Sequence, residues 1–162
     1  LTPGSFWTQP AGESHVTAAN AHDNLIYLEI DSGPYLVLSA EKAFDNGERP
    51  VNVDTRNLVW LDAKDIQWLK KNQLQMAFLW GDTDAENGSF VKLPAGFSGA
   101  VQSDNELRAV VVSGVGLHQY QETTTTLSPS SFFSSNGKVS HHIRAETELV
   151  LYINAAGRYA IE

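Results

Sequence analysis

The sequence contains no cysteine among its 162 residues, which excludes disulfide bonds, thiolate nucleophiles and cysteine-based zinc sites. Basic residues are also few: 11 Lys and Arg stand against 19 Asp and Glu, and the longest basic cluster is the pair Lys70 and Lys71. We therefore expect no nucleic-acid partner and no binding to anionic membranes. No apolar run approaches the roughly 20 residues that a membrane helix requires. The compartment stays open, because both cytosolic and exported proteins can lack cysteine.

Short runs rich in β-branched residues indicate an all-β protein. Phe90 to Leu93 and Leu107 to Val112 are two such runs, and glycine or proline residues bound both of them. This pattern is typical of the strands of sandwiches and barrels. The polar run Gln102 to Glu106 leads into the second strand, so alternate side chains of this run could point into a barrel mouth. We expect any chemistry to lie there.

The beginning of the chain is repeated near its end. Six residues recur 126 positions further on, namely Leu1, Pro3, Ser5, Phe6, Ser14 and His15 as Leu127, Pro129, Ser131, Phe132, Ser140 and His141. Tyr27, Gly33 and Tyr35 then match Tyr152, Gly157 and Tyr159, with the spacing slipping to 125 and 124. A repeat of this kind decides how the architecture is interpreted.

The repeat predicts that the chain begins in the middle of a domain, because the segment Trp80 to Glu122 has a counterpart nowhere before the first copy. We expect residues 1–36 to be the C-terminal half of a first β-barrel, 37–57 a linker, and 58–162 a complete second barrel. Apolar strands of a half-barrel should not stay exposed. The chain is therefore expected to form a homo-oligomer or to pair with a missing N-terminal segment.

Turn residues and apolar runs predict the local structure. In the first piece we expect strands at Ser5–Gln9, Val16–Ala19 and Leu25–Ile30, the last of them buried. After the linker, residues 58–61 should form a strand, and Asp62 should cap a short helix that ends at the two lysines. The threonine run 123–126 has high β propensity but few core residues, so we expect an edge strand or a loop.

The stretch from Trp80 to Gly114 resembles the first motif of the cupin superfamily, the RmlC-like jelly rolls, and PAGESH at residues 10–15 resembles the second motif, Pro-x-Gly-x-x-His. With the flanking sequences WGD, KLPAGFSG and LRAVVVSG, the chain is similar to a two-cupin (bicupin) family, domain of unknown function 4437. The resemblance implies a double-stranded β-helix, plus half of another barrel and one or two short helices. One departure stands out. Where a cupin has His-x-His, this chain has Val101, Gln102, Ser103 and Asp104.

The resemblance also implies a mononuclear Fe, Mn, Ni or Zn site, built from about three imidazoles and a carboxylate. The candidate ligands are His141, Asp104 and His118 in the second barrel and His15 in the first. Strand alternation places His141 and His142 on opposite faces, so at most one is internal. The candidate residues for a ligand pocket are Glu106, Gln102, Trp80, Arg108 and Phe133. The alternative is that the carboxylates are solvated and that His141 has a structural hydrogen bond.

Three functions remain open from the sequence. The first is binding of a small molecule by a cupin whose second barrel has lost its metal ligands. The second is a metal-dependent oxygenase or isomerase with its site in the first barrel, around His15. The third is a structural or oligomerisation module. Fold similarity does not choose among them, and the chain has no nucleophile elbow, phosphate loop or dinucleotide fingerprint.

Overall fold

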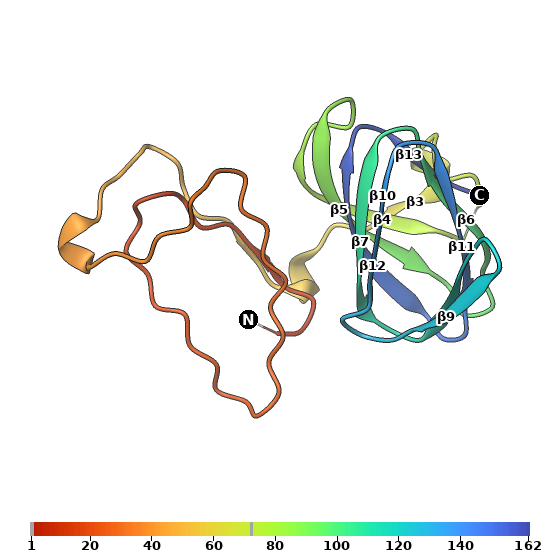
Figure 1. Ribbon diagram of the computed structural model, residues 1–162, viewed down its shortest axis with the longest axis horizontal. Coiled ribbons are helices and arrows are strands. Elements are labelled where there is room, and N and C mark those ends of the chain that lie inside the picture. The colour runs from red at the N-terminus through yellow and green to blue at the C-terminus, as the bar shows by residue number, and fades with distance from the viewer. Residues whose placement is uncertain (1, 72) are drawn as a thin grey trace. The chain divides into compact units, whose positions relative to one another are not determined.

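The computed structural model describes residues 2–71 and 73–162, which form two compact units, Leu1–Thr55 and Arg56–Glu162 (Figure 1). We call them unit 1 and unit 2. Unit 2 is a β-barrel built from two antiparallel sheets that lie face to face. Within the described ranges, no helix is both long enough and apolar enough to cross a membrane.

The first sheet of unit 2 has six strands within the described ranges, in the order β10-β7-β12-β5-β4-β3. Its strands are β3 (Leu61–Asp62), β4 (Gln75–Gly81), β5 (Glu86–Leu93), β7 (Glu106–Ser113), β10 (Phe132–Asn136) and β12 (Leu149–Ala156). β12 lies in the middle, and both of its edges are hydrogen-bonded, one to β5 and one to β7. The two β-branched runs of the sequence are therefore neighbours of one central strand.

The second sheet has five strands in the described part of the chain, in the order β13-β6-β11-β8-β9. Its strands are β6 (Ser98–Ser103), β8 (Gly116–Tyr120), β9 (Thr123–Leu127), β11 (Val139–Ala145) and β13 (Tyr159–Ile161). The threonine-rich strand β9 forms an edge of this sheet, as expected from its few core residues. The prediction of a cupin-type jelly roll is thus confirmed for unit 2.

The core of unit 2 follows from the alternation of side chains along each strand. Successive core positions on β12 are two residues apart, and the same holds on the neighbouring strands. The fully buried core side chains come from both sheets and include Leu151, Ile153, Val91, Leu107, Val101 and Ile143. The intervening residues face away from this core, which fixes the side of the sheet on which each polar residue lies.

Glycine is required at the sharp turn after β7. Gly114 has a φ of 90°, and a Cβ atom built on it would lie 2.1 Å from the carbonyl oxygen of Glu148. That contact is far too short for an alanine. The glycine that ends the apolar run in the sequence is therefore dictated by backbone geometry.

The helix expected from Asp62 to the lysines does not form. The structure has a single 3₁₀ turn, η3 (Ala63–Asp65), and the side chain of Asp62 makes no capping hydrogen bond to it. The backbone at Ile66 is already extended, because Ile66 and Leu69 bury their side chains in the core of the barrel. Packing of these two residues replaces the predicted amphipathic helix with an irregular segment.

Unit 1 contains much less regular structure than predicted. Strand β1 (Phe6–Trp7) pairs with β2 (Asn52–Val53), and η1 (Ala40–Lys42) and η2 (Thr55–Asn57) are single 3₁₀ turns, the latter at the border of the two units. The strands predicted at residues 16–19 and 25–30 are absent, and the side chain of Leu28 is 56% exposed. The prediction of a buried strand at residues 25–30 was wrong for this structure, because no described strand pairs with that segment.

Candidate functional site

Two neighbouring strands of the second sheet of unit 2 bring two imidazoles together. His141 lies on β11, on the core side of the sheet with Ile143 and Ala145, and it is only 3% exposed. His118 lies on β8 and is the cross-strand partner of Ile143, so its side chain lies on the same face. The neighbouring His142 is exposed, as the predicted alternation requires.

Direct hydrogen bonds join these imidazoles to each other and to a hydroxyl group. Nε2 of His118 lies 3.0 Å from Nδ1 of His141, and Nε2 of His141 lies 3.0 Å from Oγ of Ser135 on β10. Both ring nitrogens of His141 therefore have a partner. This satisfies the requirement that a buried polar group be hydrogen-bonded.

Aromatic rings complete the group. The Phe133 ring stacks on His118 with a centroid distance of 4.7 Å and an interplanar angle of 15°, and it lies 4.9 Å from the ring of His141. Tyr120 at the end of β8 lies 6.2 Å from His141 between ring centroids and is partly exposed to solvent. We call His118, His141, Ser135, Phe133 and Tyr120 the imidazole cluster.

Burial makes both imidazoles poor proton acceptors. Burial, together with the neighbouring His118, lowers the pKa of His141 from its ordinary value of 6.5 to about 4. Burial also lowers the pKa of His118. Both rings are therefore neutral near pH 7.

Two arrangements of protons satisfy these hydrogen bonds. In one, the Ser135 hydroxyl donates to Nε2 of His141, whose Nδ1–H donates to Nε2 of His118. In the other, Nε2–H of His118 donates to Nδ1 of His141, and Nε2–H of His141 donates to Oγ of Ser135. The series resembles a proton relay. However, a base with a pKa near 4 accepts protons weakly at neutral pH, so the geometry favours hydrogen bonding over general-base catalysis.

The predicted carboxylates lie away from the imidazole cluster. Asp104 is exposed in the turn between β6 and β7. Glu106 is in an ion pair with Arg108, at 2.5 Å between Oε1 and Nη2, and both side chains are more than a third exposed. Because Leu107 and Ala109 are the core-facing residues of β7, Glu106 and Arg108 lie on its outer side.

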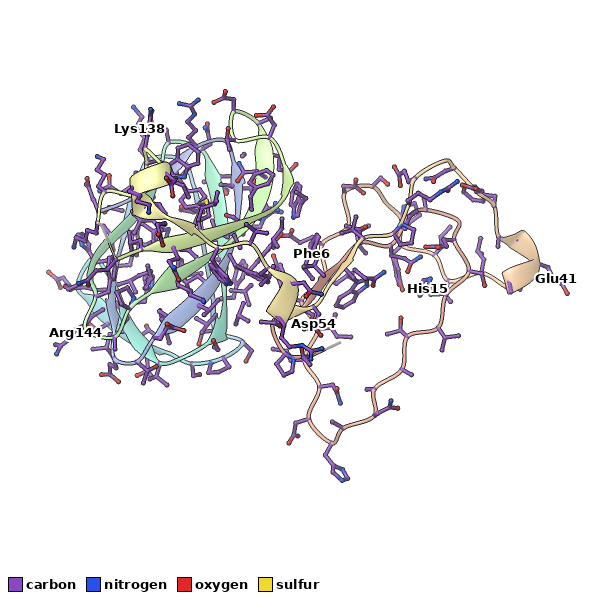
Figure 2. The ribbon with its side chains drawn as sticks, turned by 180° about the vertical axis from the view of Figure 1, so that it is seen from behind. Phe6, His15, Glu41, Asp54, Lys138 and Arg144 are labelled. Carbon is purple, nitrogen blue, oxygen red and sulfur yellow. The ribbon has the colours of Figure 1, made fainter. Side chains whose placement is uncertain are left out.

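Three other candidates also lie elsewhere. Gln102 alternates with the buried Val101 and donates a hydrogen bond to the carboxylate of Glu162. Trp80 donates its indole N–H to the hydroxyl of Tyr152, at 3.1 Å. His15 belongs to unit 1, where its exposed side chain lies on a segment without regular secondary structure (Figure 2). Of the predicted site residues, His118, His141 and Phe133 therefore lie together in the imidazole cluster.

The donor atoms of the cluster do not match a mononuclear metal centre of the cupin type. Such a centre needs about three imidazoles and a carboxylate. Among the residues that the structure describes, no three side chains of His, Cys, Asp or Glu are grouped so that they could hold a metal ion. Two imidazoles and one hydroxyl are too few, and we derive no chemistry through a metal here.

Sequence reasoning missed Ser135 and Tyr120. Strand alternation contained the signal for both, because Ser135 is two residues after Phe133 and Tyr120 is two residues after His118. Ser135 was hidden in the serine-rich tract 128–135, whose other serines lie in a turn or on the outside. Only the pairing register of β10 with β7 places Ser135 opposite the core residue Leu107, and this distinguishes it from the other serines of the tract.

Comparison with solved structures supports the fold. An RmlC-like cupin from Shewanella frigidimarina is 14% identical with a TM-score of 0.52, over 64% of this chain and 86% of that one. KdgF from Halomonas sp. is 19% identical with a TM-score of 0.52, over 65% of this chain and 92% of that one. Salicylate 1,2-dioxygenase from Pseudaminobacter salicylatoxidans is 20% identical with a TM-score of 0.50, over 58% of this chain but only 32% of that one. At these identities the likeness establishes the cupin fold alone.

Sequence comparison is more specific about the family. No curated protein matches this sequence. A protein family matches along residues 1–162, which include both units. The chain belongs to the family described as domain of unknown function DUF4437.

Proposed function

We propose that unit 2 binds a small, uncharged, hydroxyl-bearing ring compound at the imidazole cluster. The proposal rests on the hydrogen bonds that link His118 to His141 and His141 to Ser135. Beside them, the ring of Phe133 stacks on His118. Ligand sites combine an apolar lining with a few polar groups that converge. His118 is hydrogen-bonded through Nε2, so its Nδ1 is the ring nitrogen that a ligand hydroxyl could bind, and the partly exposed Tyr120 lies at the rim, where a ligand could enter.

The charge of the cluster argues for an uncharged ligand. Both imidazoles are neutral near pH 7, and none of the five side chains is a Lys, Arg, Asp or Glu. Arg108 is engaged by Glu106 on the outer side of β7. A carboxylate bound among these groups would lose hydration without gaining a cationic partner, which is unfavourable.

NMR of histidine-labelled protein tests this proposal with two probes. Catechol is an uncharged diol, and gentisate is the charged ligand in a solved structure of salicylate 1,2-dioxygenase. We expect catechol to shift the imidazole resonances of His118 and His141 but not that of the exposed His142, with gentisate binding more weakly. The variant Phe133→Leu removes the stacked ring and should weaken catechol binding. The absence of any shift at His118 and His141 with either compound would contradict the proposal.

We further propose that no transition metal takes part in binding this ligand, because two imidazoles and one hydroxyl are too few metal-ligating groups. Mass spectrometry of the purified chain after exposure to Fe, Mn, Ni or Zn should give no stoichiometric metal. The variant His141→Ala is the matched comparison. A stoichiometric metal that is lost in this variant would show that the cluster recruits further metal ligands. Metal-dependent chemistry would then become the preferred hypothesis.

A further inference from the structure

The threonine-rich strand β9 ends the five-stranded sheet of unit 2 and has an open edge. Its strand partner is β8, and on its other side no strand of the described ranges pairs with it. Figure 1 shows β9 at the margin of unit 2. The side chains of its four threonines are all exposed. An open edge of this kind is a template for pairing with a further strand.

Two other sheet edges of unit 2 offer less to a partner. β3, at one edge of the first sheet, has only two residues. β13, at the far edge of the second sheet, is already covered, because Ile161 donates a backbone hydrogen bond to Trp68 and accepts one from Lys70. Both edges are therefore too short or already occupied.

β9 projects beyond the first sheet. Thr125 is the cross-strand partner of His118, so its side chain lies on the core side of the sheet, yet it is exposed. Leu127, two residues later, is buried. On β10, the edge strand of the first sheet, the inward-facing Phe133 is also buried. The edge of β9 is therefore more accessible to a further strand than the edge of β10.

The hairpin of β8 and β9 decides which backbone groups point outward. Tyr120 and Thr123 flank its two-residue loop, and residues in these positions form a hydrogen-bonded pair. Hydrogen-bonded and non-hydrogen-bonded pairs then alternate along the strand. Thr125 thus bonds to β8, whereas the N–H and C=O groups of Thr124 and Thr126 point to the open edge.

We propose that the β9 strands of two copies of the chain pair antiparallel about a two-fold axis at Thr125, so that two five-stranded sheets join into one. In this register Thr124 of each copy lies opposite Thr126 of the other, and the pair exchanges both backbone hydrogen bonds. The two Thr125 side chains meet at the axis as a non-hydrogen-bonded pair. This surface lies in unit 2 and does not depend on the ligand proposed above.

The sequence around β9 favours a second copy as the occupant, because the strand complements itself. Threonine lies opposite threonine at positions 124, 125 and 126, and such cross-strand pairs stabilise antiparallel sheets. β9 contains no charged residue, proline or bulge, which are the usual defences of an edge strand. The nearest charged residue, Glu122, lies opposite Ser128 of the second copy. No like charges therefore meet, although each chain has a net charge of −8.

The absence of cysteine from the chain allows a direct test by disulfide trapping. In Thr125→Cys the two substituted residues lie about 4.5 Å apart between Cα atoms across the axis, which a disulfide can span. In Thr123→Cys, on the same face of the same strand, they lie about 14 Å apart along the ladder, which is too far. Under mild oxidation, we expect Thr125→Cys to form the linked dimer at least about ten times faster than Thr123→Cys. Both variants should keep the original Tm, because both positions are exposed.

Charge substitutions test the two-fold axis without a covalent bond. A five-residue pairing falls below the roughly 1,200 Å² of a stable interface, so sedimentation velocity is followed up to about 1 mM protein. Thr125→Lys places two like charges opposite each other and should weaken self-association about threefold or more. An equimolar mixture of Thr125→Lys and Thr125→Glu should restore it. Thr123→Lys, which lies opposite Leu127 of the second copy, is the matched control and should have a smaller effect.

Four results would overturn the proposal. The first is an original chain that stays monomeric at about 1 mM. The second is equal rates of disulfide formation in Thr125→Cys and Thr123→Cys, which indicates random collision. The third is self-association that Thr125→Lys leaves unchanged, which places the contact elsewhere. The fourth is a mixture of the two charged variants that associates no better than Thr125→Lys alone.

Discussion

Acidification should destabilise unit 2 through His141. Its pKa is about 4 in the folded protein, whereas an unfolded chain has the ordinary value of 6.5. Between these values the unfolded state binds more protons, so the free energy of unfolding falls as the pH falls. The contribution is fully present above pH 6.5 and is lost progressively down to pH 4.

The magnitude follows from the two pKa values. A fall in pKa from 6.5 to about 4 corresponds to roughly 3 kcal/mol of stability between pH 8 and pH 4. At pH 5 the loss should already be about 2 kcal/mol, because most unfolded chains are protonated at this histidine and most folded ones are not. The pKa of His118 is lowered as well, which adds to the effect in the same direction.

Urea unfolding at a series of pH values measures this contribution. Exchange of β12 peptides during unfolding reports on unit 2 separately from unit 1. We expect His141→Gln to be less stable at pH 8 but to lose most of the pH dependence between 4 and 6.5. His142→Gln, on the exposed face of the same strand, is the matched control and should keep the original pH profile. A His141→Gln profile as steep as that of the original chain would refute the reasoning.

Three further predictions concern the stability of unit 2. Ser135→Ala should cost about 1–2 kcal/mol because Nε2 of His141 loses its partner, whereas Ser134→Ala on the exposed side should be near neutral in the same urea assay. Leu151→Ala should cost about 2–5 kcal/mol, since this side chain is fully buried in the central strand, as calorimetry would show by a lower Tm. Gly114→Ala should cost more than about 1 kcal/mol through its contact with the carbonyl of Glu148, and an unchanged Tm would contradict the glycine's positional role.

The strands of unit 2 could be predicted because local pattern and tertiary environment agree there. Leu107 to Val112 is rich in β-branched residues, and β7 has a neighbour on each side. Residues 25–30 have an equally strong pattern but form no strand in this structure. A strand needs a partner for its backbone hydrogen bonds, and propensity alone does not provide one. The sequence therefore indicates which segments can be strands, and pairing decides which of them are.

The candidate site could be predicted only in part, for a different reason. Alternation correctly separated His141 from His142, because both lie on one strand. It could not show which strands of the two sheets meet across the core. The contact between Ser135 and His141 joins β10 of one sheet to β11 of the other. Glu106 and Arg108 were candidates by their chemistry, but the core positions at Leu107 and Ala109 place both on the outer side of β7.

The departure from the His-x-His pattern has a definite structural consequence. Val101, on the core side of β6, is the cross-strand partner of His141, and Ser103 is the next core-facing residue on that strand. An apolar side chain therefore stands beside His141, in the stretch where the family resemblance led us to expect His-x-His. The hydroxyl of Ser103 accepts a hydrogen bond from the backbone N–H of Asn105 within the turn.

His141 must satisfy its ring nitrogens with the groups that remain. Its partners are the neutral His118 and the hydroxyl of Ser135, and both nitrogens are occupied without any charged group. A metal ion would have to displace both hydrogen bonds and bring a charge next to Val101 and Phe133, which could not compensate it. Val101, Phe133, His118 and Ser135 thus surround His141 with a neutral, hydrogen-bonding interior, and this is the environment that the proposed uncharged ligand would meet.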